Sequence, residues 1–284
     1  MQPKHLLDQY GLEPKKSLGQ NFLFDENVLG RIAGAAGLAA GDEVLEIGPG
    51  LGSLTRVLAQ TAGRVVAVEL DERLLPILRA ELAAYENVAV IHGDILEQDP
   101  GELFEGPYKV VANVPYYITG AILRHLLAGG RKPTLMVLTV QKEVAERLKA
   151  EPPNMSLLAV SVQLYGQVEV VDTIKAGAFW PRPEVDSAVV RIEVKAERPL
   201  PLAEEEAFFE LVRTGFGQKR KQLQNNLRQL GYGKAQIREA LKEAGVDGRR
   251  RAETLSLEEW LGVYRSFESG RGHFGKLGAG SATF

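Results

Sequence analysis

Residues 43–52 read Glu-Val-Leu-Glu-Ile-Gly-Pro-Gly-Leu-Gly, an apolar run that ends in alternating glycines. The run predicts a buried strand, and the helical pattern at about 53–62 predicts a helix directly after it. Glycines between a strand and a helix let the backbone turn tightly and approach a ligand closely. We therefore expect a nucleotide-like cofactor at Gly48. The GxGxG spacing, with Glu46 two residues before it, fits S-adenosylmethionine enzymes better than the GxGxxG of nicotinamide-binding folds.

This turn begins a regular alternation of strands and helices. Further apolar runs lie at 64–68, 88–91, 108–112, 134–140, 168–174 and 187–194, with helical patterns at about 71–84 and 119–128. The alternation predicts parallel strands joined by helical crossovers. A Pro-rich loop, and no long helix, precedes the last run, which predicts an antiparallel edge. The expected fold is a Rossmann-like α/β sheet.

The character of the chain changes at residues 198–201, Arg-Pro-Leu-Pro. Beyond this point only helices are expected, at about 204–215, 219–230, 234–244 and 256–267. We expect a cofactor-binding catalytic domain over 1–198 and a small all-helical domain over 199–270. Residues 271–284 are rich in glycine and poor in large apolar groups, which predicts a flexible tail.

The composition excludes several kinds of chemistry. The 284-residue chain has no cysteine, which rules out disulfides, thiolate catalysis and cysteine-ligated metal. Its four histidines, His5, His92, His125 and His273, form no spaced pair, so no metal site is expected. No apolar run reaches the roughly 20 residues of a membrane span, and no signal peptide opens the chain. We expect a cytoplasmic protein that does not associate with membranes.

Residues 113–118, Asn-Val-Pro-Tyr-Tyr-Ile, follow the strand predicted at 108–112. A loop of this form at a strand end is typical of enzymes that methylate an exocyclic amine on a base. The Asn113 amide and the Pro115 carbonyl can accept hydrogen bonds from such an amine, and Pro115 stiffens the loop. Tyr116 can stack on a base that has left its helix. The alternative is an ordinary strand-end turn with a buried tyrosine.

Two carboxylates follow the next strands along the chain. Glu69 ends the run at 64–68, where a carboxylate can accept hydrogen bonds from both hydroxyls of a ribose. The alternative is a charge at a helix start. Asp94 follows the run at 88–91, where it can accept a hydrogen bond from the cofactor's adenine amine, with Ile95 against the ring. The alternative is a helix cap or turn residue.

The charge of the chain is unevenly distributed. The formal net charge is −3, yet residues 211–251 hold eleven Lys/Arg and three Asp/Glu, a local balance of +8. The basic residues are Arg213, Lys219, Arg220, Lys221, Arg228, Lys234, Arg238, Lys242, Arg249, Arg250 and Arg251. Such a surface can bind phosphates, so the helical domain is expected to bind RNA. The alternative is a solvated helix face.

Seven motifs occur in a characteristic order: GQNFL (19–23), EIGPGLGSLT (46–55), VELD (68–71), GDIL (93–96), NVPYY (113–117), VQKEVAERL (140–148) and FWPRPEVDS (179–187). With them the chain, from about Lys15 to Phe267, resembles the ribosomal RNA adenine dimethyltransferases. The bacterial branch that dimethylates two adjacent adenines near the 3′ end of 16S rRNA is the most similar. The resemblance implies a seven-stranded methyltransferase sheet with a helical C-terminal domain.

The resemblance also implies site residues. The segment with Asn21 and Leu23 closes over the cofactor in that family. Gly48, Glu69, Asp94 and Asn113 match its other S-adenosylmethionine contacts, and Phe179 matches the aromatic that holds the target adenine against Tyr116. The implied partner is 16S rRNA in the small subunit or its precursor, with a role in subunit maturation, and a monomer is expected.

Other functions stay open on the sequence. Enzymes that methylate a 23S rRNA adenine share the first motifs, although VQKEVAERL and FWPRPEVDS favour the 16S branch. A ribosome-assembly or transcription factor could keep the fold and act by binding alone, but NVPYY and GxGxG are intact. DNA adenine methyltransferases are less similar, because they usually carry Pro-Pro-Tyr after the Asp or Asn. Residues 151–158, Glu-Pro-Pro-Asn-Met-Ser-Leu-Leu, depart from the family pattern.

Overall fold

A computed structural model describes residues 2–269, so the tail expected over 271–284 lies outside the described residues. The chain forms two compact units. The first, here called the sheet unit, comprises the chain up to Glu146 together with Tyr165–Ala196. The second, the helical unit, comprises Arg147–Leu164 together with the described residues from Glu197 onward.

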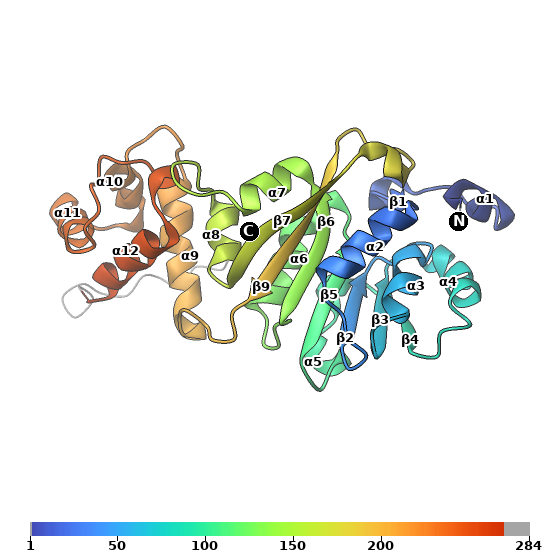
Figure 1. The fold of residues 1–284 in the computed structure, drawn as a ribbon. Coiled ribbons are helices and arrows are strands. Elements are labelled where there is room, and N and C mark those ends of the chain that lie inside the picture. Colours follow the sequence, from blue (N-terminus) through green and yellow to red (C-terminus); the bar gives the residue numbers. More distant parts are fainter. Residues whose placement is uncertain (1, 270–284) are drawn as a thin grey trace. The chain divides into compact units, whose positions relative to one another are not determined.

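A seven-stranded mixed sheet forms the centre of the sheet unit, in the order β4-β3-β2-β5-β6-β9-β7 (Figure 1). The strands are β2 (Glu43–Ile47), β3 (Arg64–Glu69), β4 (Val88–His92), β5 (Tyr108–Asn113), β6 (Leu135–Gln141), β7 (Gly166–Ile174) and β9 (Ser187–Val194). The first five in this order are parallel, whereas β9 is antiparallel to both of its neighbours. The predicted α/β sheet and its antiparallel edge are confirmed.

The parallel strands are continuous apolar runs because helices and loops cover both faces of such a sheet. The helices of this unit are α1 (Pro3–Gln9), α2 (Glu26–Ala35), α3 (Ser53–Ala59), α4 (Leu75–Glu81), α5 (Pro100–Leu103), α6 (Thr119–Ala128) and the start of α7 (Lys142–Leu148). Asp25 caps α2 by accepting from the backbone N–H of Asn27 and Val28. The buried face of α2 packs against α3 and β6.

Two features of this topology position the site. The chain leaves β2 for β3 on one side and later returns to β5 on the other, so the direction of winding reverses between β2 and β5. Ligands of open α/β sheets bind at such a reversal, outside the carboxyl ends of the strands. A two-stranded antiparallel sheet, β1 (Phe22–Leu23) with β8 (Phe179–Trp180), brings the GQNFL and FWPRPEVDS motifs together.

The helical unit contains α8 (Leu157–Gln163), α9 (Leu202–Phe216), α10 (Leu223–Asn226), α11 (Lys234–Glu243) and α12 (Leu257–Ser269). Its core is aromatic: Phe208 meets Tyr264 edge to face, and Trp260 is fully buried. A Cβ on Gly215 of α9 would lie 2.3 Å from the Trp260 ring, so this close packing requires glycine. None of the described helices is long and apolar enough to cross a membrane.

The helical unit differs from the sequence expectation in two places. Residues 147–164, expected in the first domain, cluster with this unit, and the Met155 N–H donates to the Glu253 carbonyl at 2.9 Å. The helix expected over 219–230 begins only at Leu223. The reason is that Leu223 N–H donates to the Arg250 carbonyl at 2.8 Å, so its hydrogen bond goes to a distant loop and not to an earlier helical turn.

Candidate active site

A cavity lies at the carboxyl edge of β2, β3, β4 and β5. Eight of the nine residues predicted for the site line it: Asn21, Leu23, Gly48, Glu69, Asp94, Asn113, Pro115 and Tyr116. Six of them lie at or just after the ends of β2, β3, β4 and β5. The other two are Asn21, directly before β1, and Leu23, within β1. Residues far apart in the sequence therefore meet because parallel strands end at the same edge of a sheet.

The glycine-rich turn contributes Gly48 and Gly50 to the lining of the cavity. Gly48, Gly50 and Gly52 have φ values of 66°, 60° and 78°, which side chains rarely adopt. A Cβ on Gly50 would lie 3.0 Å from the Phe22 ring. The turn thus needs glycine both for its backbone conformation and for the close approach of the Phe22 ring.

Glu69 is held by the backbone on both of its carboxylate oxygens. Its Oε2 accepts from Gly50 N–H at 3.0 Å, and its Oε1 accepts from Asp71 N–H at 2.8 Å. Burial raises the pKa of this carboxyl, since the side chain is only 5% exposed. The alternative role of a helix-start charge belongs to Asp71, whose side chain accepts from Arg73 N–H at the start of the next helical turn.

Glu46 is a site residue for which the sequence motif alone indicates no role. It lines the cavity, is 1% exposed, and its Oε2 has no hydrogen-bond partner within the described residues. Burial raises its pKa to about 8, and the charge of Glu69 adds to the shift. No ion pair joins Glu46 or Glu69 to a cationic side chain in the part of the chain that the structure describes.

These observations test whether the cavity fits the expected cofactor. Burial keeps the Glu46 carboxyl protonated near neutral pH, and a ligand that carries positive charge would favour its ionised form. S-adenosylmethionine carries a sulfonium and an ammonium group, so the residues present fit it. Glu69 would accept hydrogen bonds from the ribose hydroxyls, and Glu46 would face the cationic part of the cofactor. The glycine turn would let the protein backbone approach the cofactor closely.

Asp94 combines both of the roles weighed for it. Its Oδ1 accepts from Leu96 N–H at 2.9 Å and caps the 3₁₀ turn at Ile95–Glu97. Its Oδ2 accepts no hydrogen bond from the residues that the structure describes, so this oxygen is available to a ligand. Ile95 is buried and also lines the cavity. The pair suits a planar ring with an amino group at its edge.

Asn113 ends β5 and is fixed by the segment across the cavity. Its Nδ2 donates to the Asn21 carbonyl at 3.2 Å, so its Oδ1 stays free to accept from another donor. The Asn21 side chain donates to the Gly19 carbonyl at 3.1 Å. The Pro115 carbonyl accepts from Ile118 N–H at 3.3 Å, which closes the turn after it.

Tyr116 is anchored at its hydroxyl, which lies 2.6 Å from Ser187 Oγ. Burial raises the pKa of Tyr116, so the phenol stays neutral. Ser187 is the last residue of the FWPRPEVDS motif, so this contact connects two of the motifs seen in the sequence. The neighbouring Tyr117 lines the mouth of the cavity and is 58% exposed.

Phe179 does not lie where the sequence placed it. It is 3% exposed, belongs to the hydrophobic cluster around Leu23, and does not line the cavity. The reason is the pairing of β1 with β8, which sets Phe179 opposite Leu23. Side chains alternate along a strand, so Trp180 faces the other cluster, with Phe22. A sandwich of a base between Tyr116 and Phe179 is absent from this conformation.

Two clusters among the basic residues of the helical unit, 219–221 and 249–251, differ in their ion pairing. Lys219, Arg220 and Lys221 are exposed, and none of them forms an ion pair within residues 2–269. Arg249 pairs with Asp247 at 2.8 Å. Arg251 lies 4.0 Å from Glu253. The first group therefore has its positive charge free for a partner, whereas the second is largely neutralised by its neighbours.

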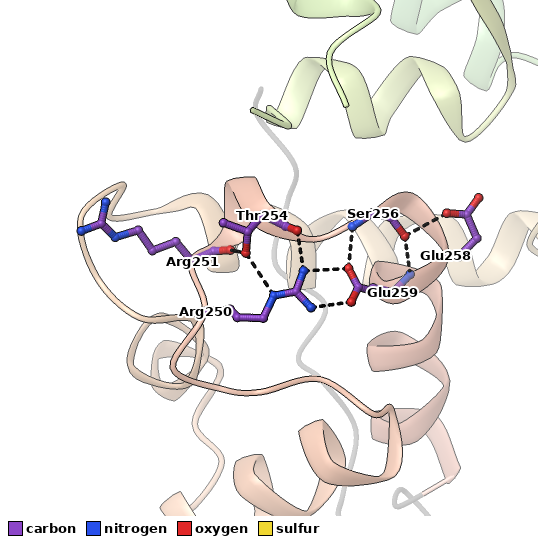
Figure 2. Close-up of polar contacts among 6 residues, drawn as sticks. All are labelled: Arg250, Arg251, Thr254, Ser256, Glu258 and Glu259. Carbon is purple, nitrogen blue, oxygen red and sulfur yellow. Dashed lines mark hydrogen bonds and ion pairs between the residues drawn. The ribbon is translucent and has the colours of Figure 1, made fainter. Parts of the chain in front are cut away.

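Arg250 is a structural residue (Figure 2). Its guanidinium pairs with both carboxylate oxygens of Glu259 and with Thr254. Glu259 in turn accepts from Ser256 N–H at 2.8 Å, and Ser256 Oγ accepts from Glu259 N–H at 3.2 Å. This is a capping box at the start of α12. The triplet 249–251 is thus not a uniform RNA-binding cluster.

A mostly parallel sheet with this glycine turn, an acidic residue at the end of β3 and an Asn-Val-Pro-Tyr segment that begins at the end of β5 defines a methyltransferase that uses S-adenosylmethionine. The comparisons with known proteins narrow this class. The family model of the ribosomal RNA adenine dimethylases matches residues 11–269. The chain belongs to the ribosomal RNA adenine dimethylase family.

Individual relatives agree with the family. Ribosomal RNA small subunit methyltransferase A of Dehalococcoides mccartyi is 47% identical over 262 residues, covering 91% of this chain and 90% of that protein. The protein of the same name from Geobacillus thermodenitrificans is 45% identical over 272 residues, covering 92% and 93%.

Solved structures share the fold. The 23S rRNA methyltransferase ErmE is similar with a TM-score of 0.71 and 33% identity, covering 87% of this chain and 100% of that one. A dimethyladenosine transferase from Plasmodium falciparum is similar with a TM-score of 0.78 and 26% identity, covering 87% and 98%.

Proposed function

We propose that this protein transfers methyl groups from S-adenosylmethionine to the N6 amines of two adjacent adenines near the 3′ end of 16S rRNA, in the small ribosomal subunit or its precursor. The observation that carries the proposal is the Asn113 amide, fixed at the end of β5 within a cavity that also contains Glu69, Glu46 and the glycine turn. An acceptor for an amine thus lies beside residues suited to a cationic methyl donor.

The protein residues act mainly by positioning. S-adenosylmethionine supplies an electrophilic methyl group when it is bound. The adenine amine is a weak nucleophile because its lone pair is delocalised into the ring. Asn113 Oδ1 accepts a hydrogen bond from this amine and favours its tetrahedral form, since Nδ2 is already bound to the Asn21 carbonyl. Holding the reactants in line supplies most of the acceleration.

Tyr116 provides the surface on which the target base rests. Its hydroxyl contact with Ser187 fixes the ring at the cavity. Stacking of a base on an aromatic ring stabilises the flipped-out state by about 1–3 kcal/mol. The Pro115 carbonyl accepts from Ile118 N–H at 3.3 Å and from Thr119 Oγ1 at 3.5 Å, so it would serve as a second acceptor for the amine by releasing the longer contact with Thr119.

The helical unit supplies the RNA-binding surface in this proposal. Lys219, Arg220 and Lys221 form an exposed basic loop without ion-pair partners in the described chain, which favours contact with phosphates. The high similarity to proteins named as small-subunit methyltransferases supports 16S rRNA over 23S rRNA, as do the VQKEVAERL and FWPRPEVDS motifs.

Label transfer tests this function. Methyl-labelled S-adenosylmethionine is incubated with the protein and either small or large subunits that lack the modification. We expect label in 16S rRNA of the small subunit alone, and labelling that is at least about 100-fold slower with the Asn113→Ala variant. Label in 23S rRNA would indicate the macrolide-resistance type of activity. Binding of small subunits without any label would indicate a non-catalytic assembly factor.

A further inference from the structure

Gln20 ties one wall of the cavity to the end of β3. Residues 18–23 line the cavity. The Gln20 Nε2 donates to Asp71 Oδ2 at 2.8 Å, and the Gln20 Oε1 accepts from Lys15 N–H at 2.7 Å. One amide therefore both closes segment 15–20 on itself and attaches it to the strand end that carries Glu69. A single side chain therefore joins this wall to the segment that follows β3.

Asp71 is a strong acceptor for this contact. It is 4% exposed and receives Arg73 Nε at 2.8 Å and Arg73 Nη2 at 2.6 Å. The Arg73 guanidinium beside it lowers the pKa of Asp71 to about 2, so the carboxylate is charged at neutral pH. Hydrogen bonds to a charged acceptor are roughly twice as strong as neutral ones.

The Gln20–Asp71 contact is connected to both halves of the site. On one side, Asp71 N–H donates to Glu69 Oε1 at 2.8 Å and orients the carboxylate expected to hold the ribose. On the other side, Gln20 precedes Asn21, whose carbonyl accepts from Asn113 Nδ2 at 3.2 Å. A shift of Gln20 would thus disturb the contacts that hold the Glu69 carboxylate and the Asn113 amide at the same time.

We infer that Gln20 and Asp71 form a clasp that sets the geometry of the site for both cofactor and target amine. They are positioning residues, since they act through Glu69 and Asn113. The inference rests on the proposed function for the identity of the two ligands. Opening the clasp weakens cofactor binding, lowers turnover at saturating cofactor and frees segment 15–20.

The test replaces Gln20 with Met, which keeps the length of the side chain and removes its amide. Ser17→Ala is the matched control, because Ser17 is exposed in the same segment and its side chain makes no hydrogen bond within the described residues. Calorimetry measures S-adenosylmethionine binding, and single turnovers on small subunits measure chemistry. Tryptic cleavage after Lys15 and Lys16, followed by mass spectrometry, reports release of the segment without any activity assay.

We expect Gln20→Met to bind the cofactor about tenfold more weakly, as for loss of one charge-assisted hydrogen bond. Cleavage after Lys15 should be several-fold faster, and Ser17→Ala should match the parent. Adding Asp71→Asn to Gln20→Met should cost less than the two single effects combined, because both remove the same contact. Gln20→Asn, which keeps the amide on a shorter side chain, serves if the Met variant fails to fold.

Parental affinity, turnover and cleavage in a folded Gln20→Met variant would overturn the clasp. Effects that are fully additive with Asp71→Asn would also overturn it, since the two residues would then act separately. A failure of the proposed function looks different. The parent would transfer no methyl to small subunits, while Gln20→Met would still change cofactor binding and cleavage.

Discussion

The two compact units offer different groups to the ligands expected of them. In the sheet unit, Glu46 and Glu69 are buried beside a cavity and form no ion pair within the described residues. In the helical unit, Lys219, Arg220 and Lys221 are exposed and equally without ion-pair partners there. The cavity offers buried carboxyl groups to a small ligand, and the loop offers positive charge to a polyanion. Catalysis and substrate binding are therefore expected to respond to different mutations and to salt in different ways.

The largest effect should come from the amide at the centre of the cavity. Asn113→Ala removes the acceptor for the target amine, and loss of one such group typically lowers turnover by about 10²–10³-fold. Binding of small subunits should stay within about twofold of the parent, because RNA affinity is spread over many phosphates. Single-turnover kinetics and filter binding check the two quantities. Equal losses of turnover and of small-subunit affinity would contradict the assignment of chemistry to the sheet unit and of RNA binding to the helical unit.

Removal of Glu69, the carboxylate expected to bind the ribose of the cofactor, should weaken binding of the methyl donor and leave RNA binding unchanged. Glu69→Ala removes an acceptor expected to bind two ribose hydroxyls, which corresponds to a loss of about 10–100-fold in affinity. Calorimetry with S-adenosylmethionine measures it, with the exposed neighbour Glu72→Ala as the control. Unchanged affinity in Glu69→Ala would remove this residue from the cofactor site.

Within the helical unit, Arg250 should behave differently from its neighbour. Arg250→Ala breaks the pair with Glu259 and the support of the α12 capping box, which should lower the free energy of unfolding by about 2 kcal/mol. Arg249→Ala removes only an exposed pair with Asp247 and should leave the free energy of unfolding close to that of the parent. Chemical denaturation of both variants checks this. Equal stabilities of the two variants would show that the Arg250–Glu259 pair contributes no more to folding than the exposed Arg249–Asp247 pair.

The exposed basic loop should control the salt dependence of RNA binding. Replacing Lys219, Arg220 and Lys221 with Ala should reduce the slope of log affinity against log salt by about 0.7–0.9 for each phosphate that the variant no longer neutralises. Cofactor affinity should match the parent. The measurement is small-subunit binding across a salt series. A triple variant with the parental slope would place the RNA surface elsewhere, with Lys15 and Lys16 as the next candidates.

The smallest effect concerns the pH dependence of stability. Burial raises the pKa of Glu46 from 4.5 to about 8, so between these values the folded protein holds a proton that the unfolded chain has released. Stability contributed by this group is present at low pH and is lost as pH rises through that window. Glu46→Gln should therefore gain at least about 1 kcal/mol relative to the parent at pH 8 compared with pH 5. Parallel pH profiles of unfolding would contradict the raised pKa.

The sequence predicted those parts of the molecule that depend on local pattern. The five parallel strands appeared as apolar runs because helices cover the faces of a parallel sheet, and β5 ends at Asn113, where the NVPYY motif begins. The glycine turn and the carboxylates at strand ends were recognisable because their spacing follows the βα connections.

What the sequence did not show depends on long-range contacts. The burial of Phe179 follows from the pairing of β8 with β1, and the late start of α10 follows from the hydrogen bond between Leu223 and Arg250. The structural role of Arg250 depends on Glu259, nine residues later. Nor does any periodicity reveal that Gln20 meets Asp71. Such pairings lie outside the range of any local pattern.

The most direct test of the central claim is nucleoside mass analysis of 16S rRNA from unmodified small subunits after incubation with S-adenosylmethionine and the protein. We predict N6,N6-dimethyladenosine at two adjacent adenines near the 3′ end with the parent protein, and unmodified adenines with Asn113→Ala. The account would be contradicted if the parent left the 16S rRNA free of dimethyladenosine, or if the Asn113→Ala variant produced as much of it as the parent.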